Sequence, residues 1–267
     1  MERERPAFQV NRNNLFYIQN KVLHVHDFNN GNDRELLSVR KLGSQYVQPR
    51  TLSYNPAEKA VLVTSPHEGG TYELFNLPRD VSGDLREPAD EGKRGSGSSA
   101  IFIARNRFAV FDKTNQQIQI RDLTNTVTKS FKPPTQINEI FYAGTSTLLM
   151  ATGTSVILYD IQQRRTIAEL TTPMVKYVVW SADMNLVALL SKHSKWTTII
   201  LLWWLKYWYS SFSLLCCVHI AITIADKDLQ QKCLIHETIR IKSGTWDDAG
   251  VFVYCTLNHI KYALPQG

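Results

Sequence analysis

The sequence of 267 residues predicts an all-β fold made of small repeated sheets. Short apolar runs, rich in β-branched and aromatic residues, alternate with turn-forming residues, and each run is too short to form a helix. A large apolar residue, a polar turn and an apolar strand also recur at intervals of about 40 residues, the size of one four-stranded propeller blade. These observations favour a β-propeller, and the hydrophobic content of 43% is sufficient for a folded core.

Five anchor residues mark the repeats, and each precedes a polar turn and an apolar strand. The anchors are Tyr54, Ile103, Tyr142, Trp180 and Trp246. Successive anchors are 49, 39, 38 and 66 residues apart. The polar stretch 81–99 explains the longer first interval as a flexible loop. Large aromatic residues at repeat positions are more often blade core than exposed contact residues, so we expect the anchors to be structural.

A second landmark follows each anchor, where an apolar strand ends in a polar residue. These landmarks are Asn76, Asp122, Asp160 and Asp226, and Asp27 ends an earlier strand in a blade that we expect to be partial. The pattern is typical of a divergent WD repeat that has mostly lost its Trp-Asp pair. Seven blades are the commonest closed ring, and an open ring leaves exposed sheet edges. We therefore expect residues 1–267 to form one partial and about five further blades of an incomplete seven-bladed propeller, within a longer protein.

One apolar segment interrupts the repeat between Trp180 and Asp226. The spacing between the anchors Trp180 and Trp246, and the spacing from Trp180 to the landmark Asp226, are both 27 residues longer than expected. The segment 195–220 holds four of the six tryptophans, and from Ile199 to Ile224 the only formal charge is Lys206. That length can cross a bilayer. However, the strands 186–190 and 221–226 belong to one blade, and a crossing would separate them. Three interpretations remain open. The segment is a translated intron or gene-model error, a loop insertion that packs on the propeller or binds a partner, or a membrane segment whose crossing prevents this blade from forming.

Composition limits the classes of partner. The net charge of +6 comes from scattered Lys and Arg residues, so nucleic acid is not favoured. The four cysteines do not form a disulfide framework, and the N-terminal residues carry no secretory signal, which together suit a reducing cytosolic setting.

Motifs for catalysis, metal binding or phosphate binding are weak throughout the sequence. His24, His26 and Asp27 lack a third metal ligand at a defined spacing and are better explained as a polar strand face. The stretch 92–99 is rich in glycine without P-loop spacing, and His236-Glu237 has no second histidine at metalloprotease spacing. Cys216-Cys217 could be palmitoylated beside the apolar segment. We expect no enzyme activity, cofactor or metal.

Several strings resemble the alpha subunits of coatomer, the COPI vesicle coat. The matching stretches are RERPAF (3–8), SYNPAE (53–58), ARNRFAV (104–110), EIFYAG (139–144), KYVVWSADM (176–184), HETIRIKSG (236–244) and NHIKY (258–262). The resemblance covers residues 2–193 and 221–267, nearly everything except the apolar segment. The beta-prime subunit is built similarly but fits these strings less well.

The resemblance implies a part of the second propeller, the coatomer WD-associated region, in a structural coat component. Such a protein works with other coatomer subunits, including beta-prime and epsilon in the full-length protein. It lies peripherally on the cytosolic side of Golgi membranes and COPI vesicles, and serves Golgi-to-ER and intra-Golgi transport. The family reads cargo tails with its first propeller, so no cargo-binding residue is transferred to this chain. The alternative function is an integral membrane protein anchored by Ile199–Ile224.

Overall fold

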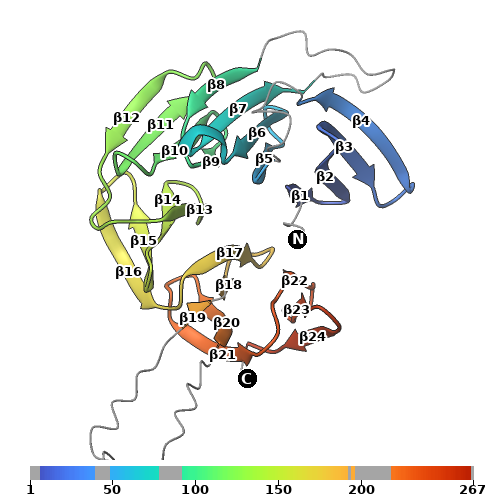
Figure 1. Cartoon of the computed structure of the whole chain (residues 1–267), viewed down its shortest axis with the longest axis vertical. Coiled ribbons are helices and arrows are strands. Elements are labelled where there is room, and N and C mark those ends of the chain that lie inside the picture. Colours follow the sequence, from blue (N-terminus) through green and yellow to red (C-terminus); the bar gives the residue numbers. More distant parts are fainter. Residues whose placement is uncertain (1–6, 40–48, 78–91, 192–193, 196–217, 266–267) are drawn as a thin grey trace, which may run out of the picture. The chain divides into compact units, whose positions relative to one another are not determined.

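The computed structural model describes residues 7–39, 49–77, 92–191, 194–195 and 218–265 (Figure 1). Six antiparallel sheets follow one another along this part of the chain, and the single helix in it is a short 3-10 turn. The predicted all-β fold of propeller type is confirmed. Alternating and continuous apolar runs, rather than helical periodicity, therefore decide the secondary structure.

The strands are assigned to sheets in chain order. The first sheet contains β1 (Phe8–Asn11), β2 (Asn14–Gln19), β3 (Val22–Asp27) and β4 (Asn32–Ser38). The second contains β5 (Thr51–Asn55), β6 (Ala60–Ser65), β7 (Thr71–Asn76) and β8 (Lys93–Ser96), with the 3-10 helix η1 (His67–Gly69) before β7. The third contains β9 (Ser99–Ala104), β10 (Arg107–Asp112), β11 (Gln117–Asp122) and β12 (Val127–Phe131).

The remaining three sheets differ in their number of strands. The fourth contains β13 (Glu139–Tyr142), β14 (Thr147–Ala151), β15 (Ser155–Asp160) and β16 (Arg165–Thr171). The fifth contains β17 (Val175–Trp180), β18 (Leu186–Ser191), β19 (Ser194–Lys195), β20 (Val218–Asp226) and β21 (Gln231–Glu237). The sixth contains β22 (Ser243–Trp246), β23 (Phe252–Cys255) and β24 (Ile260–Ala263).

The chain divides into two compact units, Met1–Thr152 with Leu158–Ile167, and Gly153–Ile157 with Ala168–Gly267. In the first unit, the opening strands of successive sheets contact one another: β1 contacts β5, β5 contacts β9, and β9 contacts β13. In the second unit, β17 contacts β22 in the same way. Contact between the first strands of neighbouring sheets is how propeller blades share their core.

The core of the second sheet lies on its second strand, β6, which has a neighbouring strand on both sides. All six residues of β6 are buried, and Val61, Leu62 and Val63 are completely inaccessible to solvent. The apolar side chains of β6 pack into clusters that also include residues of β2, β3 and β10. A strand covered on both faces reads as a continuous apolar run, which is why these segments stood out in the sequence.

The first blade is complete, and the prediction of a partial blade was wrong. β1 pairs antiparallel with β2, with Phe8 opposite Tyr17 and Asn11 opposite Asn14. β1 (FQVN) leads through the polar residues 11–14 into an apolar strand, so the repeat pattern is present there, but it was not included among the predicted repeats. Within the described residues, the incomplete sheet is instead the sixth, which has three strands.

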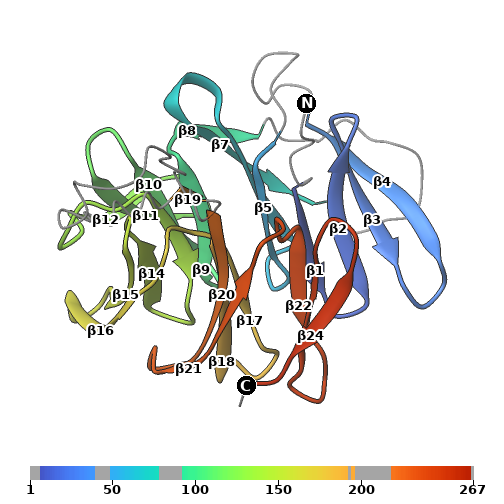
Figure 2. The ribbon, with the colours of Figure 1, turned by 60° about the horizontal axis from the view of Figure 1, so that its bottom comes forward.

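The fifth sheet keeps both strands that flank the apolar segment (Figure 2). β18 pairs antiparallel with β20, with Leu186 opposite Asp226 and Leu190 opposite Ile222, as the sequence predicted. The pairing continues through β19, where Lys195 lies opposite Val218. The structure thus assigns Lys195 and residues 218–220 to strands, whereas the sequence placed them in the insert. Residues 196–217, including Ile199, Lys206 and Cys216-Cys217, lie outside the described residues.

The predicted membrane span Ile199–Ile224 is not supported by this arrangement. Its residues from Val218 onward form β20, and Ile220, Ile222 and Ile224 are buried in the sheet. Because Lys195 and Val218 are partners in an antiparallel pair, their Cα atoms are about 5 Å apart. A single crossing of ~30 Å would have to end on the far side of the membrane. No helix among the described residues is long and apolar enough to span a membrane.

Candidate functional site

Every landmark residue is the last residue of a strand, and the four aspartates are followed directly by a turn that leads to the outer strand of the sheet. Asp27 ends β3, Asn76 ends β7, Asp122 ends β11, Asp160 ends β15 and Asp226 ends β20. The aspartates accept backbone N–H groups from the turn that follows. Asp160 Oδ1 accepts from Gln162 N at 2.7 Å and from Gln163 N at 2.9 Å. Asp226 Oδ1 accepts from Gln230 N at 2.8 Å and from Asp228 N at 3.0 Å. Such contacts stabilise the turn.

Hydrogen bonds to two of these aspartates change their acidity. The Thr124 hydroxyl donates to Asp122 Oδ1 at 2.6 Å, and this bond, with the N–H of Thr126, lowers the pKa of Asp122. Burial acts to raise the pKa of Asp226, but the Gln230 N–H and the Lys232 ammonium outweigh it, and the net pKa is lowered. A carboxylate with a lowered pKa that is engaged by its own turn is poorly suited to act as a general base.

The anchor residues all lie on the first strand of a sheet, at or near its end. They are Tyr54 on β5, Ile103 on β9, Tyr142 on β13, Trp180 on β17 and Trp246 on β22. The Tyr54 ring stacks on Phe16 of the first sheet with centroids 4.1 Å apart, and Ile103 is buried. Trp246 Nε1 donates to the carbonyl of Val179 on β17 at 2.9 Å. Tyr142 differs from the others because 41% of its surface is exposed.

Each histidine of β3 packs against an aromatic ring. His24 stacks on Tyr17 with centroids 5.0 Å apart, and His26 meets Phe28 edge to face. The Tyr17 hydroxyl donates to Asp33 at 2.5 Å, which, together with burial, raises the pKa of Tyr17 to about 12. Asp27 accepts from Asn29 N at 2.9 Å. Among the described residues, no group of three His, Cys, Asp or Glu side chains is placed to hold a metal ion.

The glycine-rich stretch after residue 92 is part of a strand. Residues Lys93–Ser96 form β8, and Gly95 lies opposite Tyr72 of β7. A Cβ at Gly95 would collide with the Tyr72 ring, so glycine is needed there for close packing rather than for a phosphate.

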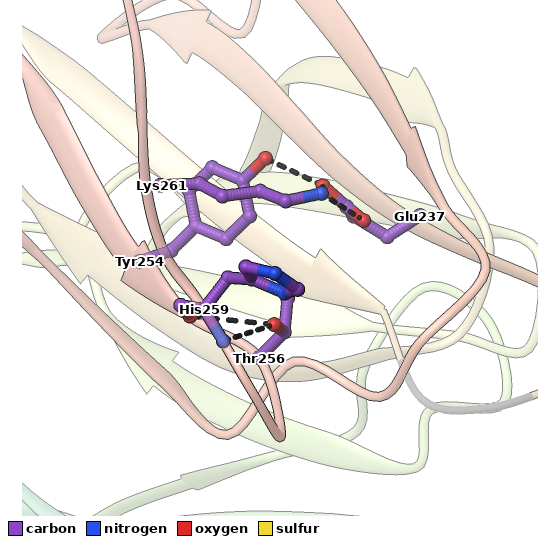
Figure 3. Close-up of polar contacts among 5 residues, drawn as sticks. All are labelled: Glu237, Tyr254, Thr256, His259 and Lys261. Carbon is purple, nitrogen blue, oxygen red and sulfur yellow. Dashed lines mark hydrogen bonds and ion pairs between the residues drawn. The ribbon is translucent and has the colours of Figure 1, made fainter.

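A buried polar cluster joins the fifth and sixth sheets (Figure 3). Glu237 ends β21, and its side chain is 8% exposed. The Tyr254 hydroxyl on β23 donates to Glu237 Oε1 at 2.6 Å. The Lys261 ammonium on β24 donates to Oε1 at 2.9 Å and to Oε2 at 3.0 Å. One carboxylate therefore binds two strands of the neighbouring sheet.

The charges in this cluster satisfy one another. Burial acts to raise the pKa of Glu237, but the hydrogen bonds from Tyr254 and Lys261 outweigh it and lower that pKa overall. Burial and the hydrogen bond to Glu237 raise the pKa of Tyr254. Glu237 is thus ionised and Tyr254 is protonated at neutral pH, with Lys261 compensating the buried charge. The arrangement links the fifth sheet to the sixth.

The outer part of the sixth sheet is apolar and exposed. Among the described strands β24 is the outermost of this sheet, and its Ile260 is 77% exposed and its Tyr262 is 74% exposed. Leu257 and Leu264, which flank β24, are also exposed. In the sequence, Glu237 stood out only in the pair His236-Glu237 and in a string that resembles coatomer alpha subunits, and residues 258–262 stood out only as another such string. The signal that was available is the alternation of Ile260 and Tyr262 with Lys261 in the last apolar run.

Comparison with known proteins connects the whole described fold to one family. The family model described as "COPA/B second beta-propeller" matches residues 20–267. The chain is 44% identical over 269 residues to coatomer subunit alpha-1 of Arabidopsis thaliana and 43% identical to coatomer subunit alpha-3 of Oryza sativa subsp. japonica. Each match covers 100% of this chain and 20% of the relative, so the chain spans about a fifth of these proteins.

A solved structure shows the same fold at low sequence identity. The beta-propeller domain of Myceliophteria thermophila Cps50 (Swd1) aligns with a TM-score of 0.63 and 12% identity. The alignment covers 98% of this chain and 83% of that domain. At this identity the likeness establishes the fold alone.

Proposed function

The chain belongs to the COPA/B second beta-propeller family, and we therefore propose that it is a structural component of the COPI coat. The observation that carries this proposal is the match over 100% of the chain to alpha subunits of coatomer at 43–44% identity. In this role the protein scaffolds vesicle formation for transport from the Golgi to the ER and within the Golgi. Its partners are other coatomer subunits, among them beta-prime and epsilon in the full-length protein.

The described side chains favour a scaffold over an enzyme. The turn aspartates are engaged by backbone N–H groups, and the buried Glu237 is engaged by Tyr254 and Lys261. These contacts hold strands and sheets in place, which is the property that a rigid assembly surface needs. The net charge of +6 suits a protein that works peripherally beside an anionic cytosolic membrane surface.

Capture from cells tests the proposal directly. The full 267-residue chain carrying an affinity tag is expressed in plant cells, and co-purifying proteins are identified by mass spectrometry. We expect coatomer subunits to co-purify, and we expect alkaline carbonate to remove the membrane-associated fraction of the chain. A matched control carries Leu62→Asp, which places a charge at a completely buried position and disrupts the second sheet. The proposal is contradicted if coatomer subunits co-purify with neither the unmodified chain nor the Leu62→Asp control. It is also contradicted if the unmodified chain stays on membranes after carbonate treatment.

A further inference from the structure

Two lysines on outer strands make the same contact with the next sheet along the chain. Lys93 on β8 donates from Nζ to the Leu123 carbonyl at 2.7 Å. Lys129 on β12 donates from Nζ to the Ile161 carbonyl at 2.5 Å. The first contact joins the second sheet to the third, and the second contact joins the third sheet to the fourth. All four residues belong to the first compact unit.

The two contacts are equivalent in register, which distinguishes them from incidental surface bonds. Lys93 lies opposite Leu74 of β7. Lys129 lies opposite Ile120 of β11. In each sheet the residue opposite the lysine is two positions before the landmark that ends the third strand. Each acceptor carbonyl belongs to the residue that directly follows the landmark of the next sheet. The same donor and acceptor positions therefore recur at two successive interfaces between sheets.

An ammonium donor suits the acceptors at these positions. Leu123 and Ile161 lie in turns rather than in strands, so their carbonyls lie outside the strand ladders. A carbonyl that is removed from water needs a partner from elsewhere. Both lysines are half-buried, and a charged donor makes a stronger hydrogen bond than a neutral one. The two contacts are therefore expected to contribute to the hold between sheets.

We propose that Lys93 and Lys129 form a repeated clasp, which ties the outer strand of one sheet to the turn after the landmark aspartate of the next sheet. The first strands of these sheets already contact one another, because β5 contacts β9 and β9 contacts β13. A tie at the outer strand adds a second line of contact, which resists opening of one sheet away from the next. Opening of each turn is thus coupled to the lysine of the preceding sheet. This inference does not depend on the proposed coat function.

The two clasps differ in the other bonds that support them. Beside the first clasp, the Tyr72 hydroxyl on β7 donates to Asn125 Oδ1 at 2.7 Å, and Asn125 Nδ2 donates to the Arg94 carbonyl on β8 at 2.9 Å. Together with the lysine, the second sheet therefore makes three hydrogen bonds to this turn. The turn of the second clasp receives its hydrogen bond from the third sheet through Lys129. Loss of Lys129 should therefore loosen its turn more than loss of Lys93 loosens the other turn.

Amide hydrogen exchange, followed by mass spectrometry on the full 267-residue chain, tests the coupling. Each turn contains backbone N–H groups that donate to its landmark aspartate, and their exchange reports local opening. In Lys129→Met we expect the amides of residues 161–164 to exchange about tenfold faster, and those of residues 123–126 to be unchanged. Lys93→Met should accelerate exchange in residues 123–126 instead, by a smaller factor, and leave residues 161–164 unchanged.

Two further variants separate the clasp from a general effect of removing a charge. Lys129→Arg keeps a cationic donor and should recover most of the protection that Lys129→Met loses. Lys113→Met makes the same change at an exposed residue in the turn between β10 and β11, and should leave the exchange of both clasped turns unchanged. The proposal is overturned if Lys129→Met exchanges like Lys113→Met. It is also overturned if exchange in Lys129→Met rises equally over all the described sheets, because the lysine then supports the whole fold and not one turn.

Discussion

The Tyr254 hydroxyl lies 2.6 Å from Oε1 of Glu237, and this contact joins β23 of the sixth sheet to β21 of the fifth. Tyr254 is 3% exposed, so its hydroxyl is held in a site that excludes water. Lys261 adds two hydrogen bonds to the same carboxylate from β24. The three residues form one polar link between the last two sheets, in addition to the hydrogen bond from Trp246 Nε1 to the Val179 carbonyl.

Loss of the Glu237 carboxylate should destabilise the protein. In Glu237→Ala the buried Tyr254 hydroxyl loses its acceptor, and we expect a loss of about 1–3 kcal/mol in the free energy of unfolding. Glu237→Gln keeps an acceptor for Tyr254 and should lose less. The control is Asp248→Ala, at an exposed residue in the turn between β22 and β23. Urea denaturation measures all three, and equal stability of Glu237→Ala and the unmodified chain would show that the link carries no stability.

The turn aspartates should act through their acceptor oxygens. Asp160→Ala removes the acceptor of two backbone N–H groups, and we expect a loss of about 1 kcal/mol. Asp160→Asn retains an oxygen in the same position and should lose less than Asp160→Ala. The comparison is made from the urea midpoints with an unchanged m value. If Asp160→Ala and Asp160→Asn lower the free energy of unfolding equally, the negative charge of Asp160, and not its acceptor oxygen in the turn, provides the stability.

Removal of residues 196–217 should leave the fifth sheet intact. Lys195 and Val218 are already partners in the ladder, so an Asn-Gly turn can connect them as a two-residue hairpin. We expect the shortened chain to keep the β-sheet circular dichroism and the melting temperature of the original chain, and to aggregate less because the apolar segment is gone. Loss of cooperative melting on this deletion would mean that residues 196–217 are needed by the fold.

Stability should decrease in acid. The pKa values of Asp122, Asp226 and Glu237 are lower in the folded protein than their ordinary values near 4. The unfolded chain therefore takes up protons first as the pH falls, so the stability from these groups is complete above about pH 5 and is lost below about pH 4. Thermal melts from pH 7 to pH 3 measure this decrease. Glu237→Gln should show a shallower decrease, and an identical slope would exclude Glu237 as a contributor.

Residues that repeat along the sequence allowed the fold to be predicted. The strand ending at Asp226 was expected to share a blade with 186–190, and Leu186 lies opposite Asp226 in the structure. β1 was missed although the run Phe8–Asn11 is followed by a polar turn and an apolar strand, because the run is only four residues long, and its pairing with β2 identifies it. The cluster around Glu237 was missed for a similar reason. Its partners lie 17 and 24 residues away on other strands, and only the contact between sheets brings them together.

The most direct test of the central claim replaces the matching segment of Arabidopsis thaliana coatomer subunit alpha-1 with this chain, which is 44% identical to it. The tagged chimera is expressed in Arabidopsis protoplasts and purified, and its coatomer partners are quantified. We predict that the chimera assembles with the other coatomer subunits as the parent does, whereas a chimera carrying the Swd1 propeller, which shares the fold at 12% identity, does not. A stable, expressed chimera that is absent from coatomer would contradict the account.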